Sequence, residues 1–438
     1  MILQNWWFTT LLGIKEPIRP PLRGHIKTDV LIVGAGVAGL SAALCLIGSG
    51  KKVVLVDKNI CGGSSTGKSA GFLTPDSELE LSQLLRKYGI NGARDLWGVA
   101  AKGVEIMVDN IQKHRIECDL QVQDCLFLGK GASGWKDVQE EVESRKKLGY
   151  SSTIYEESEV PSVIGSHVYS GAIRYSGTYG VNPLLYAQGI KQVLLDNGTE
   201  IFESSEVLSW EGHTVHTHLG SVTADKIIFC IDKPKPEITK YNQSVYHAQT
   251  FLSISEPLGD EDIAKLFPQG PMQCWDSDLI YTYFRLTGTK RLLVGGGDMI
   301  TTYAKNDTTT PRVIDHVIHE LKEKIPSIRP LRFTQYWQGR IDMTRDLVPT
   351  VLIDPERPWT HFVLGCVGLP WGTFCGNFVA QNVLDDQALD YEKYYRYFSP
   401  NRKFVIPLWM ESIFGKRLVF TINNAWAKYR QRDASAKS

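Results

Sequence analysis

The feature that most constrains this chain is a glycine motif that directly follows an apolar strand pattern. Residues 29–39 read D-V-L-I-V-G-A-G-V-A-G, which gives a G-x-G-x-x-G motif at Gly34, Gly36 and Gly39, and Asp57 ends a second apolar run, V-V-L-V-D. In a dinucleotide-binding βαβ unit, such glycines allow a tight turn, close approach of a pyrophosphate and close packing of the helix on the strand. The acidic residue accepts a hydrogen bond from a ribose hydroxyl. The motif therefore predicts a nucleotide-binding domain.

Two other interpretations of this stretch are weaker. Glycines also cluster in purely structural turns, but the flanking strand, a helix predicted over residues 40–47 and the placed acid favour nucleotide binding. Residues 30–50 are uncharged and long enough to cross a bilayer. Glycines at three of six positions argue against a membrane span, and a buried α/β core explains the apolar run.

Length and composition indicate an ordinary two-domain globular protein. At 438 residues, the chain exceeds what a single hydrophobic core normally supports. Its 48 basic and 48 acidic residues cancel, so we expect no nucleic acid partner. The N-terminus lacks the regions of a secretory signal, and the eight cysteines form no C-x-x-C pair or zinc spacing. This pattern predicts reduced thiols in a cytoplasmic protein.

Charge is concentrated at the C-terminal end. Residues 391–438 hold ten Lys/Arg and three Asp/Glu, a net +7 (10 − 3), so the rest of the neutral chain carries −7. The same tail holds eleven aromatic residues, including Trp409 and Trp426. A basic aromatic tail can bind a membrane surface or nucleic acid, and it could also contact a redox protein. We expect it instead to pack on the acidic body of its own chain.

Helical and strand patterns alternate along the chain. Residues 61–75 form a loop rich in Gly, Ser and Thr, and helices are predicted over residues 79–88, 93–113, 135–148 and 186–196. Strands are predicted over residues 125–128, within 200–230, and over 245–254, 280–286 and 291–294. From about Thr334 the pattern returns to a strand, a glycine-rich turn and a helix that ends near Leu384.

Four segments carry a family resemblance. They are the glycine motif with Asp57, residues 64–71 (S-S-T-G-K-S-A-G), Val207 with the strand pattern after it, and residues 337–349 (W-Q-G-R-I-D-M-T-R-D-L-V-P) with 364–372 (L-G-C-V-G-L-P-W-G). Over roughly residues 20–384, the chain resembles the FAD-dependent D-amino-acid oxidase superfamily, which includes glycine and sarcosine oxidases. Its γ-glutamylputrescine oxidase-like branch looks nearest.

The resemblance implies a mixed α/β and α+β fold with a discontinuous, Rossmann-like FAD-binding domain and an antiparallel-sheet substrate domain. The expected boundaries are an arm over residues 1–26, the FAD-binding domain over 27–75, 165–235 and 335–390, the substrate domain over 76–164 and 236–334, and the tail over 391–438. The residues that the resemblance places at the FAD are Gly34, Gly36, Val37, Ala38, Gly39, Asp57, Lys58, Ser64, Ser65, Thr66, Lys68, Ser69, Ala70, Gly71, Val207, Gly339, Gly365, Gly368, Leu369, Gly372 and Thr373.

Three departures from the family pattern modify these expectations. Pro370 replaces a glycine in the loop that follows Gly368, so the pocket over the flavin should differ. Gly339 stands where sarcosine oxidase-type enzymes attach flavin to a cysteine, which implies noncovalent FAD. Leu293 stands near the place of their flavin-facing lysine, so fast reaction with oxygen is not expected unless Lys290 or Arg291 turns inward.

Candidate catalytic residues are aromatic or cationic. Oxidation of an amine needs a pocket that removes a proton from an ammonium, and apolar aromatic surroundings favour the neutral amine. Tyr283 and Arg285 share one face of a predicted strand with Tyr281, Tyr179 lies in an earlier loop, and Trp371 lies in the late one. Arg285 or Arg340 could hold a substrate carboxylate through its fork of N–H donors. Each of these side chains could equally serve packing or ion pairing alone.

No metal site is expected. His213, His216 and His218 fall in a predicted hairpin, and His316 and His319 share a helix face without H-E-x-x-H spacing, so both groups are best explained as solvated surfaces.

The sequence thus predicts an FAD-dependent oxidoreductase that oxidises the C–N bond of a small amine or amino acid to an imine. The alternatives are an NAD-binding dehydrogenase, a flavin-binding assembly or interaction protein with little turnover, and an FAD enzyme that passes electrons to an acceptor other than oxygen. The sequence does not specify the amine, the acceptor or the oligomeric state.

Overall fold

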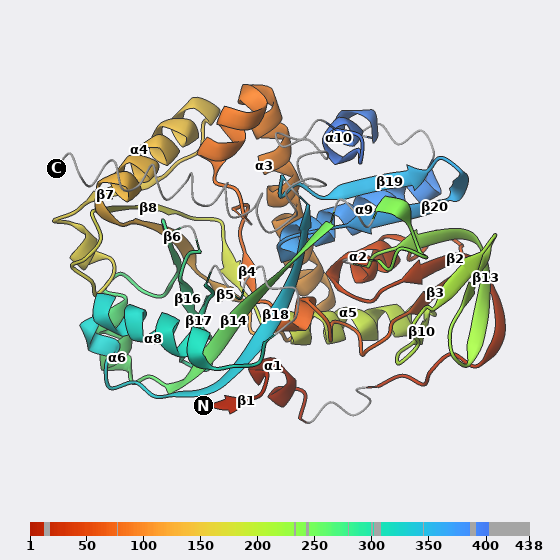
Figure 1. Cartoon of the computed structure of the whole chain (residues 1–438), viewed down its shortest axis with the longest axis horizontal. Coiled ribbons are helices and arrows are strands. Elements are labelled where there is room, and N and C mark those ends of the chain that lie inside the picture. The colour runs from red at the N-terminus through yellow and green to blue at the C-terminus, as the bar shows by residue number, and fades with distance from the viewer. Residues whose placement is uncertain are drawn as a thin grey trace.

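Two large sheets divide the molecule (Figure 1). The computed structural model describes residues 1–12, 18–76, 78–231, 234–241, 245–278, 280–298, 301, 308–344, 346–385 and 391–402. In the view of Figure 1, the parallel sheet lies on the right with α2, α5 and α9, and the larger sheet lies on the left with α4, α6 and α8.

The parallel sheet is built around β2 (Gly24–Val33), which pairs with β3 (Val53–Val56) on one side and β13 (Gly220–Phe229) on the other. Its remaining strands are β10 (Glu200–Phe202) beyond β3, β20 (Arg357–Leu364) and β19 (Thr350–Asp354) beyond β13, and the hairpin of β11 (Ser209–Glu211) and β12 (Thr214–His216). Along β2, Val30 and Ile32 pack into one apolar cluster while Leu31 and Val33 pack into another. This central strand is therefore buried on both faces, as an apolar run without alternation predicts.

Helices cover one face of this sheet. They are α2 (Val37–Cys45), α3 (Leu81–His114), α5 (Pro183–Asp196) and α9 (Leu369–Leu384). Helix α9 lies directly against α2, and a Cβ at Gly376 would sit 1.9 Å from the carbonyl oxygen of Ala38. The two helices that the sequence predicts over residues 79–88 and 93–113 are both present within α3, where they meet at Gly89, a non-helical residue with φ 68°.

The second sheet has nine strands and is mainly antiparallel. In spatial order they are β1 (Ile2–Leu3), β18 (Phe333–Thr344), β14 (Val245–Pro257), β17 (Arg291–Gly296), β16 (Tyr283–Leu286), β15 (Met272–Asp276), β6 (Asp124–Gly129), β8 (Gly171–Tyr175) and β7 (Thr153–Glu156). One face packs under α6 (Asp260–Leu266) and α8 (Arg312–Lys324), where Phe251 of β14 meets Ile314 and Leu321.

The remaining described elements are short, apart from α4. Helix α4 (Gly131–Leu148) packs near β6 and β8, and a three-stranded sheet joins β4 (Phe72–Leu73), β9 (Tyr179–Gly180) and β5 (Gln121–Val122). The 3₁₀ turns are η1 (Thr66–Lys68), η2 (Val160–Ser162) and η4 (Pro326–Ile328). Within the ranges given above, no helix is long and apolar enough to span a bilayer.

The N-terminal arm is part of the larger sheet. Strand β1 pairs with β18, and α1 (Trp6–Thr9) places Trp7 in a buried cluster beside Trp337, with ring centroids 6.2 Å apart. The indole N–H of Trp7 donates to the carbonyl oxygen of Ser69 at 2.8 Å, and Asn5 donates to that of Gly67 at 2.7 Å. The arm thus holds the glycine- and serine-rich loop from behind.

Two predicted segments lie in a different sheet from the one expected. Strands β8 and β18 fall inside residue ranges assigned to the FAD-binding domain, yet both belong to the nine-stranded sheet. Strand β18 pairs with β14, with Thr344 opposite Val245 at one end and Phe333 opposite Ser255 at the other. The local sequence pattern does not reveal which strands pair. The domain boundaries themselves stay a prediction.

The start of the C-terminal tail packs on the body of the chain. Helix α10 (Tyr391–Phe398) buries Phe398 against Trp371 and Phe378 of α9, and Arg396 and Tyr397 bind Asp95 of α3. Residues 403–438, with Trp409 and Trp426, lie outside the described residues. Their docking on this chain, a membrane or a redox protein stays a prediction.

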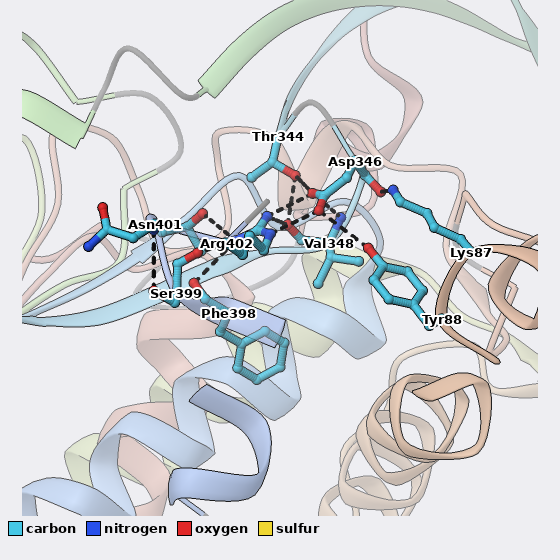
Figure 2. A network of polar contacts seen from close by, with 10 residues as sticks. Lys87, Tyr88, Thr344, Asp346, Val348, Phe398, Ser399, Asn401 and Arg402 are labelled. Atoms are coloured by element: carbon cyan, nitrogen blue, oxygen red, sulfur yellow. Dashed lines mark hydrogen bonds and ion pairs between the residues drawn. The ribbon is translucent and has the colours of Figure 1, made fainter. Parts of the chain in front are cut away.

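An ion pair fastens the described end of this segment (Figure 2). The guanidinium of Arg402 donates to both carboxylate oxygens of Asp346, at 2.7 and 2.8 Å, and to the carbonyl oxygen of Val348 at 2.5 Å. Both side chains are nearly inaccessible to solvent, with 6% and 5% exposure. Burial alone would raise the pKa of Asp346, but the hydrogen bonds and charge of Arg402 outweigh burial and lower it.

Arg402→Met should therefore destabilise the protein by about 3–5 kcal/mol at pH 7, because it leaves a buried carboxylate without its partner. The pKa of Asp346 is lowered by folding, so the pair stabilises above the unfolded pKa of about 4 and this contribution is lost as pH falls through the folded pKa. The difference in unfolding free energy between the wild type and the Arg402→Met variant should therefore become smaller in acid. Denaturant unfolding measures both effects. Arg332→Met removes an exposed pair with Glu256 and should cost no more than about 1 kcal/mol; equal costs for the two variants would contradict the anchoring role.

Candidate active site

One continuous cavity of about 2020 Å³ lies between the two sheets. Its wall comprises the N-terminus of α2, the end of β3, the loop at residues 64–70, the cavity-facing side of β14, β16 and β18, and the turn before α9. Along β14, Ala248, Thr250 and Leu252 face the cavity, while Phe251 faces the core under α8. Ligand pockets are typically about 300–1,000 Å³, so this volume suits a large cofactor together with a second molecule.

The cavity reaches the N-terminus of α2. A Cβ at Gly39 would lie 1.8 Å from the carbonyl oxygen of Gly34, so only glycine allows the helix to start this close to β2. The hydroxyl of Thr66 accepts a hydrogen bond from the N–H of Val37 at 3.0 Å. The first N–H groups of a helix have no acceptor within the helix and attract anions.

Asp57 lies at the end of β3 and also lines the cavity. Its carboxylate accepts hydrogen bonds from the backbone N–H groups of Ala35 at 2.6 Å and Asn59 at 2.7 Å. Burial raises the pKa of Asp57 to about 6, although these hydrogen bonds oppose the shift. The side chain is thus fixed beside the glycine turn, where the sequence predicts contact with a ribose hydroxyl.

Most residues predicted at the cofactor line this cavity. They are Gly34, Gly36, Val37, Ala38, Asp57, Lys58, Ser64, Ser65, Thr66, Lys68, Ser69, Ala70, Val207, Gly339, Gly368, Leu369 and Gly372. Four do not line it, namely Gly39, Gly71, Gly365 and Thr373. Two of these support the wall from behind, since Thr373 accepts a hydrogen bond from Ser41 and Gly71 accepts one from the N–H of Val181.

A buried ion pair, which the sequence did not indicate, holds the loop after β3. Lys191 of α5 lies 2.9 Å from both carboxylate oxygens of Glu203, and both side chains are almost completely buried. Glu203 also accepts hydrogen bonds from the N–H groups of Cys61 at 2.6 Å and Arg19 at 2.5 Å. The pair therefore connects α5, the loop and the N-terminal arm in a place where local sequence gives no signal.

Two of the five predicted catalytic residues line the cavity, Tyr283 on β16 and Arg340 on β18. The prediction that Arg285 holds a substrate carboxylate needs correction. Arg285 is fully buried, and its guanidinium donates to the carbonyl oxygens of Ala70 at 2.8 Å and Val181 at 2.5 Å. Burial lowers its pKa to about 10. Arg285 therefore cross-links the backbone behind the loop.

Tyr179 and Trp371 also lie away from the cavity lining. Tyr179 is in β9 of the small sheet, and Trp371 packs on Phe398 with 5% exposure. Pro370 occupies the first turn of α9, where its missing N–H costs no helical hydrogen bond, and its carbonyl contacts the Gly103 region of α3. The expectation that it alters the pocket directly is thus not met, because it is not part of the cavity wall.

The sequence indicated Tyr281 and Tyr283 but not the acidic residues beside them. We call this part of the cavity the glutamate end and define it as Glu78, Glu80, Trp275, Tyr281 and Tyr283. Burial raises the pKa of Glu78 to about 7, and burial together with the charge of Asp76 raises that of Glu80. The run D-S-E-L-E at residues 76–80, directly after the predicted cofactor loop, was the available signal.

Three carboxylates near this end have the spacing of a cation site. Oxygens of Asp76, Glu80 and Glu141 lie within 4.8 Å of one another. The guanidinium of Arg145 already bonds two of them, Glu141 at 2.9 Å and Asp76 at 3.3 Å, and its carbon lies 3.5 Å from the Tyr175 ring centroid. This arrangement provides the positive charge from the protein itself and does not call for a metal ion.

The wall near β18 carries one more polar pair that the sequence did not indicate. His247 on β14 and Asp342 on β18 both line the cavity, and His247 Nδ1 contacts the Asp342 carboxylate. They meet because β14 and β18 pair in this register, with His247 opposite Asp342. Leu347, in the left-handed region with φ 65°, lines the cavity next to Asp346, so the network of Figure 2 also supports this wall.

Comparison with known proteins identifies the class. The sequence profile of the family described as FAD dependent oxidoreductase matches residues 29–382, and the chain belongs to this family. It is 26% identical to gamma-glutamylputrescine oxidoreductase of Escherichia coli K12 over 338 residues, which cover 75% of this chain and 77% of the relative. It is 21% identical to glycine oxidase of Geobacillus kaustophilus over 350 residues, covering 76% and 85%.

Solved structures share the fold. Glycine oxidase from Geobacillus kaustophilus superposes with a TM-score of 0.73 at 18% identity, covering 86% of this chain and 100% of that one. L-Proline dehydrogenase from P. horikoshii superposes with a TM-score of 0.72 at 16% identity, covering 86% of this chain and 98% of that one. The predicted family, the mixed α/β fold and the assignment as an FAD-dependent oxidoreductase are confirmed. The N-terminus of α2 at the cavity wall, the carboxylate of Asp57 and the cavity volume fit an FAD.

Asp57→Asn should weaken FAD binding about ten- to a hundredfold, since a charge-assisted hydrogen bond contributes about 1.5–3 kcal/mol. In the wild type, FAD affinity should rise with pH through about 6 as Asp57 ionises and becomes a better acceptor. The variant should lose this step. Fluorescence titration of the apoprotein with FAD from about pH 5 to 8 measures both. Asp29→Asn, which changes the acid on β2 that binds Lys52 N–H, is the matched control, and an Asp57 variant that binds like it would refute the ribose contact.

Proposed function

We propose that this enzyme oxidises the C–N bond of a small amine or amino acid to an imine, which water then hydrolyses, with FAD bound noncovalently. The observation that carries the proposal is the single cavity that joins the N-terminus of α2 to an aromatic chamber. The relatives named for gamma-glutamylputrescine, glycine and L-proline support a nitrogen-bearing substrate. Gly339, which replaces the attaching cysteine, supports noncovalent binding.

When bound, the flavin supplies the two-electron acceptor that takes a hydride from the carbon next to nitrogen. The protein must first bring the amine to its neutral form, because an ammonium has no lone pair to assist loss of hydride. Phe72 and Tyr283 line the cavity edge to face, with centroids 5.9 Å apart. Such aromatic walls exclude water and favour the neutral amine over the ammonium.

Tyr283 and Arg340 are the residues we propose at the substrate. Tyr283 lies flat on Gly295, where a Cβ would come within 2.2 Å of its ring, so its position is fixed by the sheet. Arg340 lies next to Gly339 on β18 and offers a guanidinium that pairs with a carboxylate if the substrate is an amino acid. The sequence offered Arg285 and Arg340 as candidates to bind a substrate carboxylate. Because Arg285 donates to backbone carbonyls, we propose Arg340 for this role.

A flavin protein without turnover is the competing function, and blockage of the pocket by Pro370 and Trp371 would support it. Neither residue lines the cavity, and Trp371 packs under α10 instead. The cavity is therefore open to a second molecule beside the cofactor.

The function is tested by anaerobic mixing of the FAD-loaded enzyme with a panel of amines and amino acids. At least one of them should bleach the flavin absorbance, because hydride transfer needs no oxygen. Tyr283→Phe should retain binding and Tyr283→Ala should lose much of the rate by opening the aromatic wall to water. A flavin that no member of the panel reduces, while dithionite reduces it fully, would favour the protein without turnover.

Reoxidation by oxygen should be slow. Oxygen activation benefits from a fixed positive charge at the flavin, and Leu293 is buried in an apolar cluster with Trp7 and Trp337. Lys290 pairs with Asp260, and Arg291 lies over Trp6, so neither turns inward.

Stopped-flow mixing of the reduced enzyme with air-saturated buffer measures the reoxidation rate. We expect it to be slower than turnover with a quinone acceptor. Reoxidation as fast as turnover would overturn the argument from Leu293. Lys68, which lines the cavity, would then be the candidate for the positive charge at the flavin.

A further inference from the structure

Two carboxylates of the glutamate end have no cationic partner among the described side chains. Glu78 accepts a hydrogen bond from the hydroxyl of Tyr281 at 3.2 Å, and Glu80 Oε1 accepts one from the indole N–H of Trp275 at 2.9 Å. The second oxygen of Glu80 is shielded from bulk solvent and has no hydrogen-bond partner in the described part of the chain. Neither carboxylate is thus paired with a positive charge within the described part of the chain, and an ammonium in the cavity would supply one.

Four neighbouring acids differ, because they are paired with cations of the protein. These pairs are Arg145–Asp76 at 3.3 Å, Lys324–Asp276 at 2.7 Å, Lys130–Asp278 at 2.9 Å and Arg86–Glu140 at 3.1 Å. Asp137 of α4 adds a further carboxylate to the same wall. The protein thus balances the acids around this end and leaves Glu78 and Glu80 to face the cavity.

The rest of the glutamate end is aromatic. Tyr281 and Tyr283 lie 5.7 Å apart between ring centroids, and Trp275 lies 6.3 Å from Phe127, which also lines the cavity. Ring faces attract ammonium groups, and a carboxylate beside them adds charge pairing and a hydrogen-bond acceptor. Aromatic rings with two carboxylates form a site for an alkylammonium and a poor site for an anion.

We propose that the glutamate end binds a second ammonium group, so that the substrate is a diamine or a longer polyamine. This inference rests on the proposed oxidation of an amine elsewhere in the same cavity. The two nitrogens then have opposite requirements. The reacting amine must be neutral, which an apolar wall such as that at Phe72 favours, while the distant ammonium stays charged beside Glu78 and Glu80. A cation there also favours the ionised forms of the two carboxylates, whose pKa values burial raises.

The test measures binding of three four-carbon amines to the FAD-loaded enzyme by anaerobic calorimetry, so turnover is not needed. The compounds are 1,4-diaminobutane, 4-aminobutan-1-ol and 4-aminobutanoate, which place an ammonium, a neutral hydroxyl or a carboxylate at the far end. We expect the diamine to bind about ten- to a hundredfold more tightly than the amino alcohol. Glu78→Gln or Glu80→Gln should remove most of this preference, so that the ratio of the two affinities falls to within about twofold.

Glu140→Gln is the matched control, because Glu140 lines the same cavity but is already paired with Arg86. It should keep the preference for the diamine. Since Glu80 is the N-cap residue of α3, Glu78→Gln decides the result if the Glu80 variant fails to fold. Equal affinities for diamine and amino alcohol, or tightest binding of 4-aminobutanoate, would overturn the inference. Bleaching of the flavin in the same samples reports separately on the proposed oxidation, so the two proposals can fail independently.

Discussion

The architecture of the cavity depends on how closely α2 packs against its neighbours. At Gly39 the helix meets the turn after β2, and at Gly376 helix α9 meets α2, in contacts where a Cβ would lie within 2 Å of a backbone oxygen. Any larger side chain at these two positions would push α2 away from the sheet or from α9. The close packing fixes the N-terminus of α2 at one end of the cavity. The position of the FAD pyrophosphate therefore depends on these two glycines.

The rest of the cavity is assembled from segments far apart in the chain. The N-terminal arm holds the loop at residues 64–71 through Trp7, Arg285 holds it through Ala70, and the Lys191–Glu203 pair holds its start at Cys61. Arg285 and the Lys191–Glu203 pair thus stabilise the loop around the cofactor site, while Glu78 and Glu80 line the cavity. This contrast separates supporting side chains from those able to meet a substrate.

Local sequence was sufficient to predict the nucleotide end. Gly34 and Gly36 form a turn and Asp57 ends a strand, and all three lie within thirty residues of one another in the sequence. Their spacing alone is therefore enough to predict their arrangement. Arg285 shows where such reasoning fails. Period-two alternation places it correctly on the face of Tyr283, but the backbone of Ala70 and Val181 covers it, and that contact spans more than one hundred residues. The His247–Asp342 pair likewise depends on long-range strand pairing. The glutamate end depends on long-range hydrogen bonds, from Tyr281 to Glu78 and from Trp275 to Glu80.

The central claim is that one cavity holds FAD at the N-terminus of α2 and an amine toward the glutamate end. A crystal structure of the FAD-loaded enzyme with 1,4-diaminobutane, prepared without oxygen, tests it most directly. The account predicts the cofactor pyrophosphate at Gly36 and Val37, and one amine nitrogen within hydrogen-bond distance of Glu78 or Glu80. A diamine bound outside the cavity, or a cofactor whose pyrophosphate avoids α2, would contradict the account.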